Sequence, residues 1–87
     1  MNHKTIWDAI ESFAAKHKLT CSALARTGGL DATTFNKSKR WSNAGQERFP
    51  SMGSVAKFLR ATNSCFMEFA EHIKQAEEKN EKVKSKE

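Results

Sequence analysis

Apolar residues recur at steps of three and four positions near the start of the chain. This spacing is carried by Ile6, Ala9, Ile10, Phe13 and Ala14. It places their side chains on one face, so the pattern predicts an amphipathic α-helix. Thr5 and Asp8 resemble a capping box, and we expect the helix to begin there. Lys16 and Lys18 suit its last turn, where positive charge is favourable, and Trp7 is expected at the edge of the core.

A second amphipathic stretch follows Pro50, and Ser51 is the expected N-cap of its helix. The apolar face of this helix consists of Met52, Val55, Ala56, Phe58 and Leu59. Asn63 suits a left-handed stop. A further helix begins at Ser64 or Cys65, and the sequence does not decide between these two caps. The expected buried stripe of this last helix is Phe66, Phe69, Ala70 and Ile73.

The apolar period fades after Ile73 into the segment QAEEKNEKVKSKE. This segment has high helix propensity and several Glu-to-Lys pairs at four-residue spacing, but few side chains to bury. It is either an extension of the preceding helix or a solvated linker. We therefore expect one folded domain over residues 1–73 and a charged tail or linker over residues 74–87.

A glycine-hinged pair of short helices is predicted in the middle of the chain. The first helix covers residues 21–27, with Thr20 as its N-cap and a hydrophobic staple from Leu19 to Leu24. Gly28 and Gly29 then end this helix and turn the chain, and one of them is expected at positive φ.

Asp31 is the expected N-cap of the second helix of the pair, which we place over residues 32–38. Leu30 and Phe35 form its staple. Two stapled helices around a glycine turn make a helix-turn-helix, and the second helix, TTFNKSKR, has a polar and basic outer surface.

Residues 39–49 have no clear periodicity and contain Asn-Ala-Gly turn chemistry. We expect an extended loop that Trp41 and Phe49 anchor against the core, in which Arg40 and Arg48 could flank a phosphate. The complete architecture is then all-α, a compact arrangement of five helices around one core.

Composition limits the possibilities further. A chain of 87 residues with 38% hydrophobic content forms one small domain. No apolar run approaches the roughly 18 residues that a membrane span needs. The N-terminus has no signal-peptide core, so we expect a cytoplasmic protein without membrane contact.

The excess positive charge lies in the predicted domain. The formal net charge is +5, yet residues 71–87 contain five Lys and five Glu, which cancel. Residues 1–70 contain ten Lys or Arg against five acids, and Lys37, Lys39, Arg40 and Arg48 surround only Glu47. A basic excess beside an exposed helix indicates a polyanionic partner, although ordinary solubility charge is the simpler alternative.

The cysteines and histidines indicate no further chemistry. Cys21 and Cys65 belong to no paired motif, and a disulfide is not expected in a cytoplasmic protein. His3, His17 and His72 show no metal-ligand spacing. We therefore expect no metal, no cofactor and no enzymatic activity, since the chain also lacks a Gly-rich phosphate loop and paired carboxylates.

The chain resembles the lambda repressor-like DNA-binding domains of phage and bacterial regulators. The matching features are Ala25, Gly29, Leu30, Phe35, Pro50, Ser51, Val55, Leu59 and the closing SCFMEFA. The run LARTGGLDATTFNKSKR followed by RFPSMGSVAKFL is similar to the amino-terminal domain of LexA-like, self-cleaving prophage repressors. The similarity covers roughly residues 6–72.

Two departures from this family pattern are visible. Ser38 stands where the motif usually has an apolar residue, so the second helix of the pair would end early or be covered by the following loop. The carboxy-terminal protease and dimerisation domain of such repressors has no counterpart in the sequence, which fits an isolated domain or a naturally short repressor.

The resemblance implies a sequence-specific repressor that binds a pseudo-palindromic, double-stranded DNA operator as a homodimer. Its base-reading positions correspond to Ala32, Thr33, Thr34, Asn36 and Lys37. Hydroxyl, amide and ammonium groups of these types can hydrogen-bond base edges in the major groove. The expected phosphate contacts are Cys21 and Ser22 at a helix N-terminus, with Lys39, Arg40 and Arg48.

A second hypothesis is a protein-interaction module, of the antirepressor or antitoxin type, that uses the same fold without reading DNA. It would be favoured by an acidic or apolar outer surface on residues 32–38, whereas the sequence there is polar and basic. The surface for self-association is not marked, and the helix around Phe66, Phe69 and Ile73 is our expectation for it.

Overall fold

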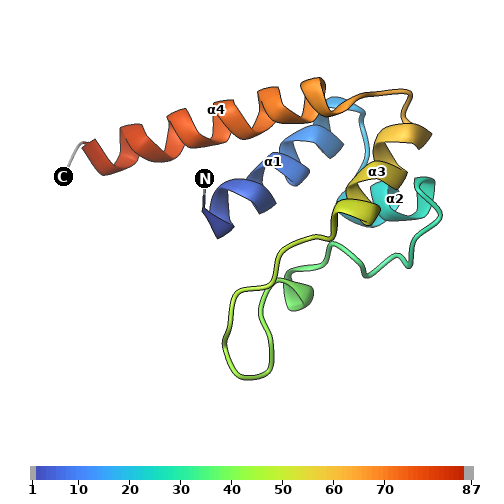
Figure 1. The fold of residues 1–87 in the computed structure, drawn as a ribbon, viewed down its shortest axis with the longest axis horizontal. Helices are drawn as coiled ribbons and strands as arrows, with labels where there is room; N and C mark the ends of the chain where they lie inside the picture. Colours follow the sequence, from blue (N-terminus) through green and yellow to red (C-terminus); the bar gives the residue numbers. More distant parts are fainter. Residues whose placement is uncertain (1, 86–87) are drawn as a thin grey trace.

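A computed structural model of the chain describes the fold of residues 2–85 and the side chains of residues 2–80. This part of the chain is all-α and contains four α-helices and one turn of 3-10 helix. They are α1 (His3–Lys16), α2 (Cys21–Thr27), η1 (Lys37–Lys39), α3 (Met52–Ala61) and α4 (Phe66–Ser85). Helices α1 and α4 run side by side, and α2 and α3 lie together beyond one end of α1 (Figure 1).

Side-chain caps begin three of these helices. The Asn2 side chain accepts the Thr5 amide at 2.9 Å, so α1 begins at His3 and the predicted start at Thr5 is wrong. Thr5 is instead 1% exposed, and its hydroxyl accepts from the Asn80 side chain of α4 at 3.1 Å. The caps predicted at Thr20 and Ser51 are confirmed, since each hydroxyl accepts the amide three residues on at 3.0 Å.

The predicted chain reversals lie where residues tolerate positive φ. Gly29 has φ +76° after α2, and Asn63 has φ +57° after α3. Gly28 serves a different purpose, because a Cβ atom there would lie 3.1 Å from the backbone nitrogen of Phe58. The glycine pair therefore combines a left-handed turn with close packing of α2 on α3.

Aromatic rings fill the centre of the molecule. Phe58 of α3 contacts Phe13, Phe35 and Phe69, with ring centroids 5.2, 5.6 and 5.8 Å away. Trp7 is 3% exposed, which places it within the core rather than at the predicted edge. The expected apolar faces are also corrected at three positions. Met52, Phe66 and Ala70 are exposed.

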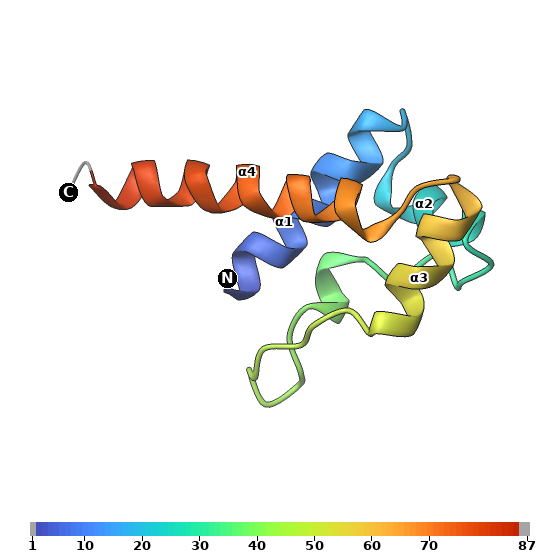
Figure 2. The same ribbon diagram turned by 45° about the horizontal axis from the view of Figure 1, so that its top comes forward.

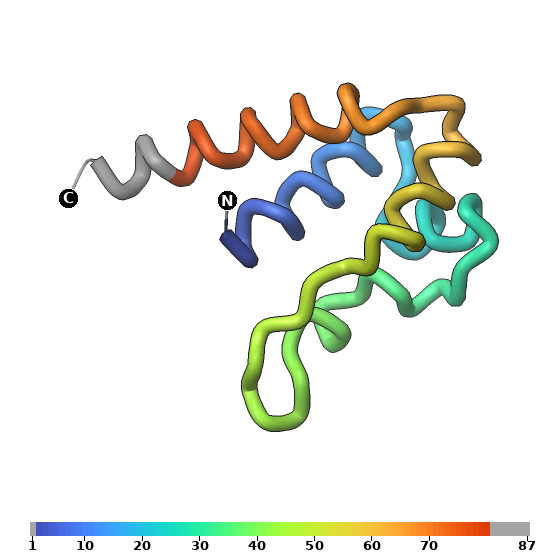
Figure 3. Tube along the Cα trace, in the orientation of Figure 1, coloured from blue at the N-terminus to red at the C-terminus, as the bar shows by residue number. Residues whose placement is uncertain are grey.

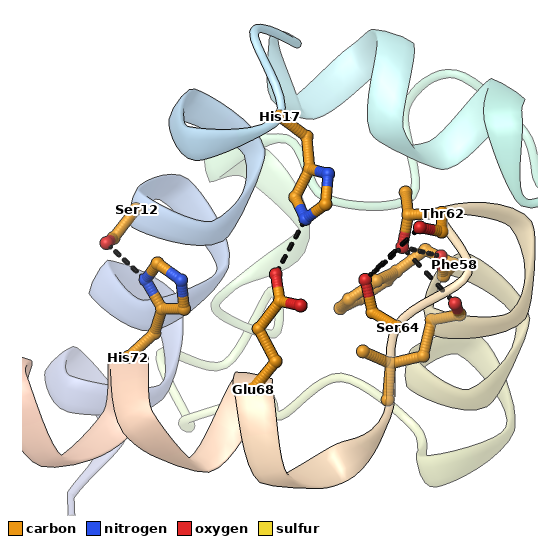
Figure 4. Close-up of polar contacts among 8 residues, drawn as sticks. Ser12, His17, Phe58, Thr62, Ser64, Glu68 and His72 are labelled. Carbon is orange, nitrogen blue, oxygen red and sulfur yellow. Dashed lines mark hydrogen bonds and ion pairs between the residues drawn. The ribbon is translucent and has the colours of Figure 1, made fainter.

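The α1–α4 interface contains polar contacts that the apolar stripe did not predict. Ser12 and His72 are joined by a 2.6 Å hydrogen bond, and His17 pairs with Glu68 at 2.7 Å (Figure 4). The hydrogen bond from His17 is the largest cause that lowers the pKa of Glu68. His72 is 6% exposed and is part of this interface, although sequence reasoning did not include it in the buried stripe.

The segment after Ile73 continues as helix in the structure, up to Ser85. Ala76 is buried, and Asn80 reaches Thr5 of α1. Of the two alternatives for this segment, the described residues show the helix extension. Residues 86 and 87 of the predicted tail, and the side chains from residue 81 onward, lie outside the described part (Figure 3).

The helix predicted over residues 32–38, the third of the five expected helices, is absent, so this prediction is wrong. Residues 32–35 form turns, Asn36 has extended backbone angles of φ −66° and ψ 154°, and only η1 follows. The physical reason lies in the side chains. Thr33 and Thr34 hydrogen-bond back to Asp31, which favours turns over helix, and Phe35 alone among these seven residues is fully buried.

Candidate nucleic-acid interface

Asp31 organises the turn that replaces the predicted helix. Its carboxylate accepts the Thr33 amide at 2.9 Å and the Thr33 hydroxyl at 2.7 Å. The Thr34 hydroxyl donates to the Asp31 carbonyl at 2.6 Å. The bonds from Thr33 lower the pKa of the Asp31 carboxyl, so it is ionised at neutral pH. Asp31 therefore accepts a backbone amide, but it closes a turn and does not cap the predicted helix, which is absent.

Phe35 separates an inner from an outer side of this segment. Its ring is 1% exposed and lies between Trp7 and Phe58. The five residues predicted to contact bases lie directly before and after Phe35 in the sequence. Thr33, Asn36 and Lys37 are exposed, and Ala32 and Thr34 are partly exposed. One buried ring thus leaves the polar and cationic side chains of this segment on the surface.

The following residues form a hairpin loop (residues 40–48) whose base is fixed by backbone bonds. The Arg48 amide donates to the Arg40 carbonyl at 2.9 Å, and an antiparallel bridge joins Trp41 to Glu47. Gly45 makes the tip turn at φ +82°. The expected extended loop is therefore a closed hairpin, and it projects away from the helices (Figure 2).

Two side chains from α1 hold the base of the hairpin loop. His3 Nε2 lies 2.7 Å from the Arg40 carbonyl and 3.2 Å from Trp7 Nε1. Trp7 Nε1 donates to the Arg48 carbonyl at 3.0 Å. The predicted anchors are less buried. Trp41 is 50% and Phe49 is 55% exposed, though both rings contact His3. Sequence reasoning missed His3, because no motif marks it.

Arg40 supports this region from within, although it was predicted to contact phosphate. Its guanidinium donates to Glu11 at 2.8 Å and to the Phe35 carbonyl at 3.2 Å, and it lies over the Trp7 ring. Its side chain is 11% exposed, so the charge is already paired and largely covered. Arg40 therefore joins α1 to the turn segment and presents little surface to a partner.

Cys21 and Ser22 lie at the beginning of α2, and both are partly buried. Burial raises the pKa of the Cys21 thiol, and the Glu11 carboxylate raises it further, against a smaller opposing effect of Arg40. The thiol is therefore neutral at pH 7. Neither residue lines a hollow together with Lys39 or Arg48, the exposed cations that were also predicted to contact phosphate.

Lys39 and Arg48 stand between two hollows on the surface. The first hollow has a volume of about 630 Å³ and the second of about 320 Å³, and both cations line both hollows. On its other sides the first hollow is lined by Asp31, Thr33, Thr34, Ser51 and Ser54. The second is lined by Ser38, Trp41, Ser42 and Asn43. Four residues from the predicted site, Thr33, Thr34, Lys39 and Arg48, thus meet at the first hollow.

Lys37, another residue of the predicted site, does not line the first hollow. Lys37 lines a separate hollow of about 380 Å³ with His3 and Trp41. Among residues 2–80, no three His, Cys, Asp or Glu side chains come together as metal ligands. No helix of the described part is long and apolar enough to cross a bilayer.

Comparisons with known proteins add no relationship. No family model, no curated protein sequence and no solved structure matches this chain.

Proposed function

We propose that this chain is a sequence-specific DNA-binding domain of a transcriptional repressor, of the prophage-repressor type that its sequence resembles. The observation that carries the proposal is the outward position of Thr33, Asn36 and Lys37 on a segment that Phe35 attaches to the core. Asn36 and Lys37 are exposed and are not used in the packing of the fold, and Thr33 is exposed although its hydroxyl donates to Asp31.

The charge of the same surface supports a polyanionic partner. Arg40 is neutralised by Glu11, but Lys37, Lys39 and Arg48 form no ion pair with any described residue. Cations of this kind bind phosphates, release counterions from DNA and so provide affinity that falls with salt. Lys39 and Arg48 would position the domain on the backbone, while the neighbouring polar groups read the bases.

The types of exposed side chain suit base recognition in the major groove. Asn36 can pair with adenine, and Lys37 can donate to the acceptors of guanine. Thr33 and Thr34 offer hydroxyl and methyl groups, and Ala32 offers a methyl group to thymine.

A single domain of this size reads few bases, so the proposal includes a homodimer on a symmetric operator. Of the three residues expected at the dimer surface, Phe69 is 5% exposed and Ile73 packs against the core. Phe66 is 46% and Met67 is 75% exposed at the start of α4. We therefore place the dimer contact at Phe66 and Met67.

Selection on randomised duplex DNA tests the proposal directly. We expect a sequence motif with two half-sites about one helical turn apart. The double variant Thr33→Ala, Lys37→Ala should lose the preference for this motif while its melting temperature changes little, since both side chains are exposed. A variant with two exposed substitutions on α4, Lys74→Ala and Gln75→Ala, is the matched control. Full discrimination by the Thr33, Lys37 variant would reject this segment as the reader.

The missing helix also favours a second candidate function, a protein-interaction module. Turns at residues 32–35 and the half-exposed Trp41 and Phe49 side chains form a surface that a protein partner could cover. Salt dependence separates the two functions. Binding of duplex DNA should weaken steeply between two salt concentrations if phosphates are the partner, whereas absent or salt-independent binding would favour the interaction module.

A further inference from the structure

We propose that the hairpin loop (residues 40–48) is a second DNA-contacting element, which crosses the phosphate backbone next to the bases that residues 32–37 read. This inference rests on the proposed function and assigns an additional contact surface to the same DNA. The residue at its centre is Asn43, which sequence reasoning did not include in the site.

The hairpin loop is held in a fixed position relative to the base-reading segment. Its two ends are joined by the bond from the Arg48 amide to the Arg40 carbonyl. The ends also contact α1, because Trp7 donates to the Arg48 carbonyl and His3 Nε2 lies 2.7 Å from the Arg40 carbonyl. Ser42 organises the tip, because its hydroxyl accepts the amides of Ala44 and Gln46 at 3.2 and 3.0 Å. A loop tied at both base and tip loses little conformational entropy when it contacts a partner.

The two hollows connect the loop to the predicted DNA surface. Lys39 and Arg48 line both, so Thr33 and Thr34 lie on one side of these cations and Ser42 and Asn43 on the other. A phosphate backbone bound by the two cations would therefore have the base-reading segment on one side. The flank of the hairpin loop would lie on its other side.

The hairpin loop is short and reverses beside the two cations. Its sides run from Arg40 to Ser42 and from Gln46 to Arg48, and residues 43–45 make the turn between them. The loop projects clear of the helices in two views (Figures 1 and 2). A DNA backbone bound by Lys39 and Arg48 would therefore pass beside the flank of the loop, and the exposed tip would face the groove beyond that backbone.

The chemistry of the tip suits this position. Residues 42–46 carry no charge, and Asn43 is exposed and forms no side-chain hydrogen bond with any described residue. An amide can donate to phosphate oxygens or to the acceptors on the floor of the minor groove. Glu47 is the one acid of the loop, and it lies beside Arg48, closer to the base than to the tip.

Opposite charge changes at one position test the inference. We would measure duplex affinity at several salt concentrations for Asn43→Asp and Asn43→Lys in the full chain. The matched controls are Gln75→Glu and Gln75→Lys, which change an exposed amide residue by the same charges on α4, away from the loop. None of these four changes removes a buried side chain, so all variants should fold.

We expect Asn43→Asp to weaken binding about tenfold at low salt and Asn43→Lys to tighten it. The slope of log affinity against log salt should become steeper by about one for Asn43→Lys, since one more phosphate is neutralised. Hydroxyl-radical footprints of the wild-type chain should extend past the selected half-site, and Asn43→Asp should lose this outer protection. Both Gln75 variants should change affinity less than twofold.

Two results would overturn the inference in distinguishable ways. If the wild-type chain binds duplex DNA but the Asn43 and Gln75 variants behave alike, the hairpin loop is no contact and the proposed function stands. If the wild-type chain binds no duplex at any salt concentration, the proposed function fails and the inference fails with it.

Acrylamide quenching of tryptophan fluorescence gives a separate readout. Trp41 is half exposed and Trp7 is buried, so bound DNA should protect Trp41 from the quencher.

Discussion

The α1–α4 pair and residues 31–50 are held in place in different ways. Along α1 and α4, buried side chains recur on successive turns, and the two helices contact each other from Asn80 at one end to His17 at the other. Residues 31–50 contribute one fully buried side chain, Phe35, and are otherwise held by hydrogen bonds from α1. The first region uses its side chains to fold. The second is placed by its neighbours and leaves most of its own side chains exposed.

The largest expected loss of stability comes from removing the ring of Phe35, the one fully buried side chain of residues 31–50. Phe35→Ala should cost about 3–5 kcal/mol of unfolding free energy, because it leaves a cavity between Trp7 and Phe58. Urea denaturation measures this cost, with Phe49→Ala, at a 55% exposed ring, as the control that should cost under about 1 kcal/mol. Equal costs for the two variants would mean that residues 31–50 are not attached to the core through Phe35.

Arg40 is the next test, because it joins the two regions electrostatically. Arg40→Ala should cost about 2 kcal/mol, since it removes a charged hydrogen bond to Glu11, one to the Phe35 carbonyl and the contact with Trp7. Lys39→Ala, at an exposed neighbour, should cost about 0.5 kcal/mol or less. The order should reverse in DNA affinity. Lys39→Ala should lower binding more than Arg40→Ala does, although its stability changes little. A destabilised Lys39→Ala or a neutral Arg40→Ala would contradict this division of roles.

The same contrast explains what could be predicted from the sequence. The bounds of α2, the caps at Thr20 and Ser51, and the left-handed stop at Asn63 follow from local chemistry, which the sequence contains directly. Four of the five apolar positions predicted on α1 are buried, because they lie on successive turns. Ile6 is only partly buried, and the burial of His3, Thr5 and Trp7 does not follow from the apolar period.

Residues 31–40 could not be predicted in the same way, because local signals there favour two outcomes. Asp31 and the Leu30–Phe35 spacing are typical of a helix start, but the same Asp31 and Thr33 side chains also close a turn. The positions of His3 and Arg40 depend on contacts 37 and 29 residues away in sequence, which no local pattern contains.

Gly29, after α2, and Gly45, in the hairpin loop, both have positive φ. The same substitution at each position therefore compares the helical part of the molecule with the loop. Gly29→Ala should cost about 1 kcal/mol, because φ +76° is strained for alanine although a Cβ atom there would meet nothing within 4 Å. Gly45 has φ +82° and equally open surroundings, but it lies at the tip of the hairpin loop. Gly45→Ala should therefore cost less than half as much in global stability, since residues 43–47 are exposed and the strained turn can adjust without disturbing the core. Equal costs would show that the hairpin loop unfolds only together with the helices.

The smallest effect that we expect is a pH dependence that belongs to the α1–α4 interface alone. Burial is the largest cause that lowers the pKa of His72 from its usual 6.5, and the charge of Lys16 lowers it further. Glu68 opposes this shift, and His17 and Glu71 have smaller effects of opposite sign. The unfolded chain then binds a proton below pH 6.5 that the folded chain resists. The unfolding free energy should be fully present above pH 6.5 and should decrease as pH falls below it.

Urea denaturation at pH 7.5 and 5.5 measures this dependence, and the lower value stays above the pH range where Glu68, with its lowered pKa, titrates. His72→Gln retains a hydrogen-bonding partner for Ser12 but removes the titration, so the loss of stability on acidification should be smaller in this variant. Duplex affinity measured at both pH values should respond to His72→Gln equally, because residues 31–50 do not contact His72. If His72→Gln instead changed the pH dependence of DNA binding, the two regions would be coupled, and the helical pair would do more than support the surface that we assign to DNA.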